Sequence, residues 1–189
     1  MVDSKQQRRL EMKAIRNSLQ DRDISKRSQI IEEQLLSLDA VQAAAKFFIY
    51  VSFRSEVQTH HLIDKLIASG KQLTVPHVVD AKMMHAVRFT AWDQMSPDRF
   101  GVLTPVSPVL DEDKIDICIA PGLAFSVSGD RLGYGKGHYD RFLARCRPRL
   151  AIGLALDCQI VESLPSDQFD RQMDLIVTEQ RIIELGTEA

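Results

Sequence analysis

The stretch KFFIYVSF, residues 46–53, decides the fold. It is an apolar run of strand length, which is typical of a strand covered on both faces of a sheet. A second run, IDICIAPGLAF at residues 115–125, predicts another buried strand that ends in a Pro-Gly pair. Strands buried on both faces occur mainly in parallel sheets flanked by helices.

The segments around these two runs predict further helices and strands in alternation. Helices are expected at about 4–19, 25–38, 59–68 and 137–146, and further strands at 72–79, 84–90, 149–156 and 174–179. The polar, proline-containing stretch 93–114 is interpreted as a long surface connection. Strands alternating with helices imply parallel crossovers. The sequence therefore predicts an α/β fold: one three-layer, Rossmann-like domain over residues 1–189, with a mostly parallel central sheet.

The charge of the chain is nearly balanced but unevenly distributed. The formal net charge is -2, which argues against a protein that binds nucleic acid along its whole surface. Residues 1–27 nevertheless hold eight Lys and Arg against four Asp and Glu, and residues 131–149 hold six against one. Two local basic regions on a faintly acidic protein favour a small anionic ligand over a long polyanion.

The cysteines and the hydropathy pattern bear on location. The three cysteines, Cys118, Cys146 and Cys158, are odd in number and widely spaced, so they predict neither a disulfide framework nor a zinc site. No apolar run approaches the roughly 18 residues of a membrane span, and the first residues have no apolar signal core. We expect a cytoplasmic protein without a membrane or nucleic-acid partner, monomeric or at most a weak dimer.

The stretch GDRLGYGKGHYDR, residues 129–141, contains four of the chain's nine glycines. A cluster of this density is typical of backbone that must approach a ligand closely. Its spacing matches neither the P-loop nor the dinucleotide fingerprint, since five residues separate Gly129 from Gly135 and Gly137 follows Lys136 directly. Two interpretations stay open from the residues alone: a phosphate site, or a glycine-rich turn that leads into a solvated basic helix.

The phosphate interpretation has a physical basis in the loop. Gly133, Gly135 and Gly137 can present successive amides to phosphate oxygens, at the positive end of the helix that follows. Lys136 adds a mobile charge, and Arg131 adds a bidentate fork. A carboxylate such as Asp140 would repel a bare phosphate, but suits Mg²⁺ held between protein and phosphate oxygens.

These residues resemble the signature of the 5-formyltetrahydrofolate cyclo-ligase family, R-L-G-x-G-x-G-x-Y-D, which here is Arg131 to Asp140. The resemblance extends to the P-G-x-x-F that ends the preceding strand, at 121–125, and to the basic pair Lys5 and Arg9. It also covers the segment VSFRSEVQT at 51–59 and Met173-Asp174 before a late strand. It therefore spans nearly the whole chain in the family's order.

The resemblance implies an enzyme that uses ATP as co-substrate and Mg²⁺ as cofactor to convert 5-formyltetrahydrofolate into 5,10-methenyltetrahydrofolate. The implied ATP-binding residues are Lys5, Arg9, Arg131, Leu132, Gly133, Tyr134, Gly135, Lys136, Gly137, His138 and Tyr139. Val51, Glu56, Tyr134 and His138 are implied at the folate, Asp140 and Asp174 at the metal, and Lys136 and Arg131 in catalysis.

Two rival functions remain. One is a relative of the same fold that lacks catalysis and binds nucleotide, folate or RNA, the last through its basic helix. The other is a sugar-phosphate isomerase or acyl-CoA transferase on a related α/β scaffold. Neither the isomerase nor the transferase needs ATP. The second rival therefore leaves unexplained why a metal-binding acid follows a basic glycine loop.

Overall fold

The structure is a computed structural model that describes residues 4–98 and 101–185. Its helices are α1 (Ser4–Asn17), α2 (Asp21–Ser37), α3 (Asp39–Ala43), α4 (His60–Ala68) and α5 (His138–Cys146), with short 3-10 turns at Trp92–Gln94 and Asp157–Gln159. Its strands are β1 (Lys46–Ile49), β2 (Gln72–Val78), β3 (Met84–Arg88), β4 (Met95–Pro97), β5 (Leu103–Pro105), β6 (Ile117–Ala120), β7 (Ala124–Ser126), β8 (Arg131–Leu132), β9 (Leu150–Leu154), β10 (Ile160–Val161), β11 (Leu175–Val177) and β12 (Ile182–Glu184).

Seven strands form the central sheet in the order β12-β11-β9-β6-β1-β2-β3. The five inner strands pair in parallel, and only the edge strands β3 and β12 run antiparallel to their neighbours. All residues of β1 and β6 are buried, as the two apolar runs predict. The predicted α/β fold with a mostly parallel sheet is confirmed.

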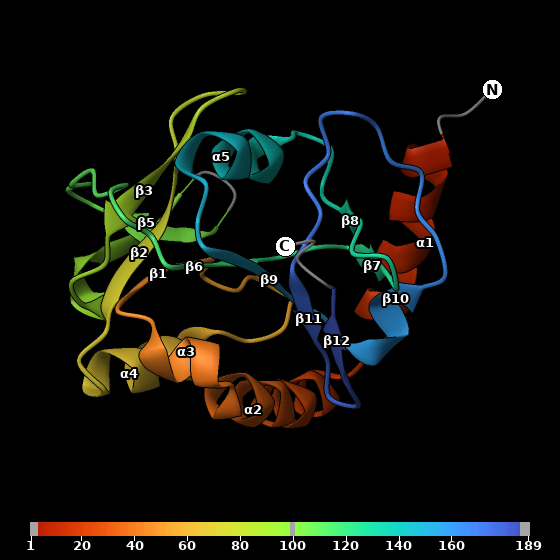
Figure 1. Cartoon of the computed structure of the whole chain (residues 1–189), viewed down its shortest axis with the longest axis horizontal. Helices are drawn as coiled ribbons and strands as arrows, with labels where there is room; N and C mark the ends of the chain where they lie inside the picture. The colour runs from red at the N-terminus through yellow and green to blue at the C-terminus, as the bar shows by residue number, and fades with distance from the viewer. Residues whose placement is uncertain (1–3, 99–100, 186–189) are drawn as a thin grey trace.

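Helices cover both faces of this sheet (Figure 1): α2, α3 and α4 lie on one face and α5 on the other. Successive side chains of β1 therefore enter different cores. Phe47 packs with Ile31 and Leu62 on the first face. Phe48 points to the second face and stacks on Phe142 of α5, with ring centroids 4.1 Å apart. The central strands β1 and β6 are therefore buried on both sides, which explains their apolar runs.

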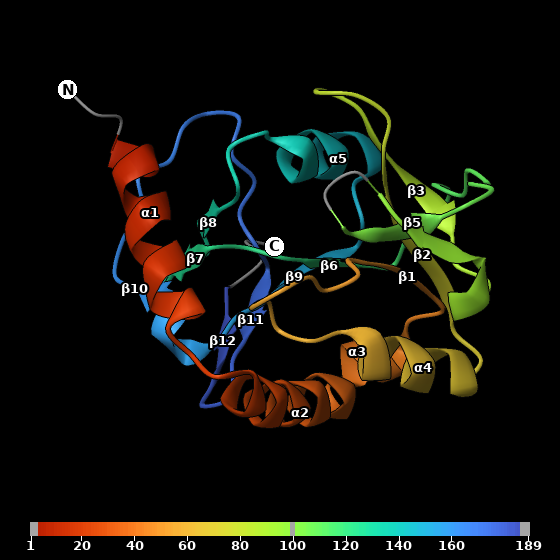
Figure 2. The same ribbon diagram turned by 180° about the vertical axis from the view of Figure 1, so that it is seen from behind.

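A second sheet, β10-β7-β8, lies beside the main one and carries α1. Figure 2 shows α1 running along these three strands. Met12 of α1 packs there against Leu123, Leu132 and Leu164, in a core of its own. This contact fixes α1 so that its other side faces the glycine loop.

Three features differ from the sequence expectations. The run 115–125 is not one strand: β6 and β7 belong to different sheets, and Pro121-Gly122 separates them because proline cannot donate to a ladder. Residues 93–114 contain a short hairpin, β4 with β5, rather than only a connection. Helix α3 and strand β12 were not expected. None of the helices in the described ranges has the length and hydrophobicity needed to cross a bilayer.

Candidate active site

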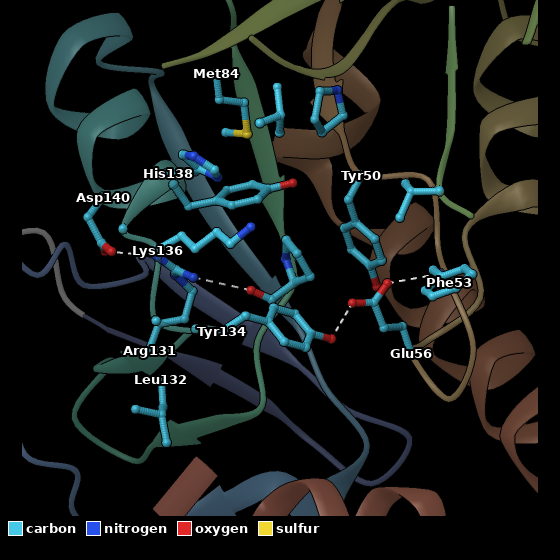
Figure 3. A pocket seen from close by; sticks show the side chains of 18 of the residues that line it. Tyr50, Phe53, Glu56, Met84, Arg131, Leu132, Tyr134, Lys136, His138 and Asp140 are labelled. Carbon is cyan, nitrogen blue, oxygen red and sulfur yellow. Dashed lines mark hydrogen bonds and ion pairs between the residues drawn. The ribbon is translucent and has the colours of Figure 1, made fainter. Parts of the chain in front are cut away.

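A cavity of about 1240 Å³ opens beyond the carboxyl ends of β1 and β6, between α1 and the glycine loop. Ligands of α/β sheets bind at such ends. Figure 3 shows side chains from several elements that point into it. The predicted site residues that line it are Lys5, Arg9, Val51, Glu56, Arg131, Leu132, Gly133, Tyr134, Gly135, Lys136, Gly137, His138, Tyr139 and Asp140. Residues implied separately for nucleotide and for folate thus share one cavity.

Asp174 is the predicted site residue that does not line this cavity. It directly precedes β11, and its Oδ2 accepts a hydrogen bond of 2.6 Å from the amide of Ala151, at the start of β9. Its own amide donates to the Ala151 carbonyl at 2.8 Å. Oδ2 of Asp174 thus fastens the beginning of one strand to its neighbour, and the role of Asp174 as second metal ligand stays a prediction. Within residues 4–98 and 101–185, no group of three or more acidic, His or Cys side chains is arranged to hold a metal ion.

The glycine loop, residues 133–137, connects β8 to α5. Gly135 has φ +95°, a conformation that side-chain-bearing residues rarely adopt, and a Cβ there would lie 3.3 Å from the guanidinium carbon of Arg9. Gly137 caps α5 in the left-handed region, with φ 62°. In the part of the chain that the structure describes, the amides of these two glycines donate no hydrogen bond. The loop thus presents unused donors at a helix N-terminus, as an anion site requires.

Arg131 and Asp140 form a largely buried ion pair in the cavity wall. The Arg131 Nη2 donates to Asp140 Oδ1 at 2.8 Å, and Nη1 donates to the Pro121 carbonyl at 3.3 Å. The Arg131 side chain is only 3% exposed, so it is fixed rather than mobile. The predicted phosphate-binding cation and the predicted metal ligand therefore neutralise each other in this state.

Two buried polar atoms of the cavity wall have no hydrogen-bond partner among the described residues: Arg131 Nε and the Tyr139 hydroxyl. Unpaired buried polar groups are rare and costly, so each needs an explanation. Burial raises the pKa of Tyr139 well above its usual value, with smaller effects from nearby groups, so the phenol keeps its proton. Both atoms are donors that a polar ligand can satisfy.

The basic face of α1 also lines the cavity, through Lys5, Arg9, Lys13 and Arg16. Arg9 Nε donates to the Gly133 carbonyl at 3.0 Å, so the helix is joined directly to the glycine loop. Lys5 Nζ contacts Asp167, at 2.9 Å, and Asp170. Burial lowers the pKa of Lys5, but hydrogen bonds and charge from these two acids outweigh it and raise that pKa. The steps of four, four and three between these residues place all four on one side of the helix, but the resemblance implied only Lys5 and Arg9 at the nucleotide.

Glu56 lies at the other end of the cavity in a fixed network. Its Oε2 accepts from the Phe53 amide at 2.9 Å, and its Oε1 accepts from the Tyr134 hydroxyl (Figure 3). Burial raises the pKa of Glu56, although these hydrogen bonds and the charge of Arg16 act in the opposite direction. Two donors on two oxygens fit the ionised carboxylate. Tyr50, which sequence reasoning missed, borders this end and donates to the Val57 carbonyl at 2.9 Å.

His138 joins the start of α5 to the turn between β2 and β3. Its Nε2 lies 3.1 Å from the carbonyl oxygens of both Asp80 and Ala81. Because both partners are acceptors, Nε2 carries the proton. Arg141 supports the same turn through the Lys82 carbonyl, at 2.7 Å. The imidazole therefore has a structural contact in addition to its place in the cavity wall.

The chain is similar to known proteins over most of its length. The model of the 5-formyltetrahydrofolate cyclo-ligase family matches residues 1–179. The chain belongs to this family. A relative named 5-formyltetrahydrofolate cyclo-ligase from Haemophilus influenzae is 32% identical over 173 residues, covering 88% of this chain and 92% of the relative. One of the same name from Escherichia coli K12 is 30% identical over 158 residues, covering 80% and 87%.

Solved structures agree with this family membership. The NMR structure of Aquifex aeolicus 5,10-methenyltetrahydrofolate synthetase is similar, with a TM-score of 0.87 and 28% identity over 99% of this chain and 95% of that one. A synthetase of the same name from Mycoplasma pneumoniae shares the fold, with a TM-score of 0.75 at 22% identity. The expectation that the chain belongs to an enzyme family is confirmed.

Proposed function

We propose that this protein converts 5-formyltetrahydrofolate and ATP into 5,10-methenyltetrahydrofolate, ADP and phosphate. The observation that carries the proposal is that the glycine loop and Glu56 line one cavity. At about 1240 Å³ it exceeds the roughly 300–1000 Å³ that is typical of a pocket for one small molecule. A shared cavity of this size supports two co-substrates bound side by side, which group transfer between them requires.

ATP solves the problem of the leaving group. Closing the ring expels the oxygen of a formamide, and hydroxide leaves poorly at neutral pH. In the proposed first step the formyl oxygen attacks the γ-phosphorus, and ADP departs. In the second step N-10 attacks the activated formyl carbon, the bond from that carbon to the phosphorylated oxygen breaks, phosphate leaves, and N-10 loses its proton. Phosphoryl transfer of this kind depends on positioning and charge neutralisation more than on a strong base.

The phosphate end would be the glycine loop with the cations around it. The amides of Gly135 and Gly137 and the Arg131 Nε find no acceptor among the described residues, and they are donors suited to phosphate oxygens. Lys136 stands on the exposed part of the same loop and would neutralise charge that develops during transfer. Lys5 and Arg9 approach from α1, and Leu132 and Tyr139 would complete the wall.

Magnesium fits this site through a single carboxylate. Asp140 lines the cavity at the start of α5, and Mg²⁺ commonly takes one or two protein oxygens, with phosphate and water as its other ligands. When bound, the ion would supply neutralisation of phosphate charge. Asp174 is the second protein ligand that the resemblance implies; its Oδ2 bonds the amide of Ala151, and it lies outside the lining of the cavity.

The folate end would be formed by Glu56, Tyr134, Val51 and His138. An ionised carboxylate at the base of a cavity can accept hydrogen bonds from N–H groups of a pterin ring. Val51 is buried beside it and would supply an apolar wall. The imidazole of His138, held by the β2–β3 turn, would contribute a flat surface near the glycine loop.

The test is a direct assay. Purified protein with 5-formyltetrahydrofolate should develop methenyl absorbance only when ATP and Mg²⁺ are both present, with each omission as control. RNA or folate binding without turnover would favour the relative that lacks catalysis, and ATP-independent turnover of a sugar phosphate would favour the isomerase. We propose in addition a cytoplasmic, monomeric enzyme; gel filtration at several protein concentrations tests the monomer, and fractionation of cells tests the location.

A further inference from the structure

Arg16, in the last turn of α1, is a buried cation of the cavity wall that the proposed reaction has not used. Its residue is only 4% exposed. Burying a guanidinium costs free energy unless its donors find acceptors, so its partners indicate why it is there. Its three hydrogen-bond partners lie far away in the sequence, on different segments around the cavity.

The guanidinium of Arg16 connects three segments. Its Nε donates to Ser55 Oγ at 3.1 Å, in the turn that carries Glu56. Its Nη1 donates to the Gly122 carbonyl at 3.4 Å, between β6 and β7. Its Nη2 donates to the Tyr134 hydroxyl at 3.0 Å, on the glycine loop. One side chain thus joins the turn of Glu56, the link between β6 and β7, and the Tyr134 hydroxyl.

The contact with Tyr134 also decides where the phenol proton goes. A guanidinium only donates hydrogen bonds, so the Tyr134 oxygen accepts from Arg16 and its single proton is left for another acceptor. That acceptor is Glu56 Oε1. Among the described residues Glu56 makes no direct ion pair, and the positive charge of Arg16 reaches it through the phenol. A chain of this kind strengthens both hydrogen bonds.

We propose that Arg16 is a positioning residue for the folate: it orients the Tyr134 hydroxyl and thereby keeps Glu56 ionised and aimed into the cavity. This inference rests on the proposed function, since it assigns Glu56 to the folate. The inference assigns two different roles to the cations on one face of α1. Lys5 and Arg9 serve the phosphate end, whereas Arg16 serves the folate end through Tyr134.

The experiment measures steady-state kinetics for Arg16→Met, Tyr134→Phe and the double variant, with both substrates varied. Arg16→Met removes the charged donor of the hydrogen bond to Tyr134. We therefore expect it to lower kcat/KM for 5-formyltetrahydrofolate about 10- to 100-fold. KM for ATP should stay near the wild-type value. Arg16→Lys, which keeps the charge but not the fork, should recover part of the loss.

The double variant tests whether Arg16 acts through Tyr134. If it does, the two losses are strongly non-additive and the double variant resembles the worse single one. Full additivity, or an equal rise in both KM values, would overturn the inference and leave a merely structural role. Arg8→Met is the matched control, because Arg8 lies on the same helix in a surface ion pair with Glu11 and outside the cavity.

Failure of this inference is distinguishable from failure of the proposed function. If the wild-type protein does not cyclise the folate, the function is wrong. If the wild type turns over and Arg16→Met does so equally well, only the role of Arg16 is wrong. If Arg16→Met does not fold, the single and double variants are made with Arg16→Lys and Tyr134→Phe instead. Additive losses of kcat/KM in that set again overturn the proposal.

Discussion

The two ends of the cavity differ in how completely their polar groups are used. At the Glu56 end both carboxylate oxygens accept hydrogen bonds, and the surrounding tyrosines and Arg16 are held in place. At the glycine-loop end neither the amides of Gly135 and Gly137 nor the Arg131 Nε donates to any described residue. The folate end is therefore pre-organised by the protein, whereas the phosphate end is completed by its ligand.

The largest expected effect comes from the charge of the phosphate end. Lys136→Ala should lower kcat about 10²- to 10³-fold, because a cation that acts on developing charge is lost. The thermal transition should stay close to that of the wild type, since the side chain is exposed. Lys26→Ala is the control, being exposed on α2, across the sheet from α5. Normal turnover of Lys136→Ala would mean that the phosphates bind elsewhere.

A matched pair of glycine variants separates backbone strain from site geometry. Gly135→Ala should raise KM for ATP about tenfold or more and lower Tm, because Gly135 has φ +95° and a Cβ would press on Arg9. Gly70→Ala imposes similar strain, at φ +79°, but a Cβ there meets nothing within 4 Å and lies outside the cavity. It should lower Tm and leave KM unchanged. Equal KM values for the two variants would contradict a phosphate role for the loop.

The pH dependence of folate use tests the pre-organised end. The groups that face Glu56 are Arg16, Tyr50, Phe53, Tyr134 and Tyr139. Burial raises the pKa of Glu56, so kcat/KM for folate should fall with decreasing pH through a value above that of an ordinary glutamate. Glu56→Gln should remove this limb and lower kcat/KM about tenfold.

Tyr134→Phe sharpens the same test. The Tyr134 hydrogen bond lowers the pKa of Glu56, so its loss should raise that pKa and move the acid limb of the profile to higher pH. The measurement is kcat/KM for 5-formyltetrahydrofolate across the acid range, with ATP saturating. If the acid limb stays in place in Tyr134→Phe, or persists in Glu56→Gln, the limb reports the titration of a group other than Glu56.

The smallest effect is expected at the rim of the phosphate end. Asp170 pairs with Lys5, a cation implied to reach the nucleotide, and thus competes with phosphate. Asp170→Asn should lower KM for ATP by about two- to fivefold, the scale of a partly exposed ion pair, and the change should shrink at high salt. A rise in KM for ATP would show that the acid helps binding instead.

The inner strands of the fold could be predicted because their signal is local. In KFFIYVSF the consecutive residues Phe47 and Phe48 fill two different cores, so both have to be apolar. The second sheet could not be predicted, since β8 and β10 have two residues each and no period can be read from two residues. The β4–β5 hairpin was missed for a similar reason, having strands of three residues.

The site was predictable where its residues are contiguous and not where they meet only in space. The loop from Arg131 to Asp140 carries its glycines and charges within ten residues. Arg16 reaches Tyr134 across 118 positions, and its place on one side of α1 with Lys5 and Arg9 does not reveal that partner. The role of Asp174 at the metal stays a prediction, because a carboxylate before a strand can also bind a neighbouring strand, as Oδ2 does here with the amide of Ala151.

The central claim is that the glycine loop receives the triphosphate while the Glu56 end receives the folate. Amide chemical shifts of ¹⁵N-labelled protein test it most directly, with a non-hydrolysable ATP analogue and 5-formyltetrahydrofolate added separately. The account predicts that the analogue with Mg²⁺ shifts the Gly133, Gly135 and Gly137 amides, and that the folate shifts the Phe53 amide. Glycine resonances that stay unchanged at saturating nucleotide, while others move, would contradict it.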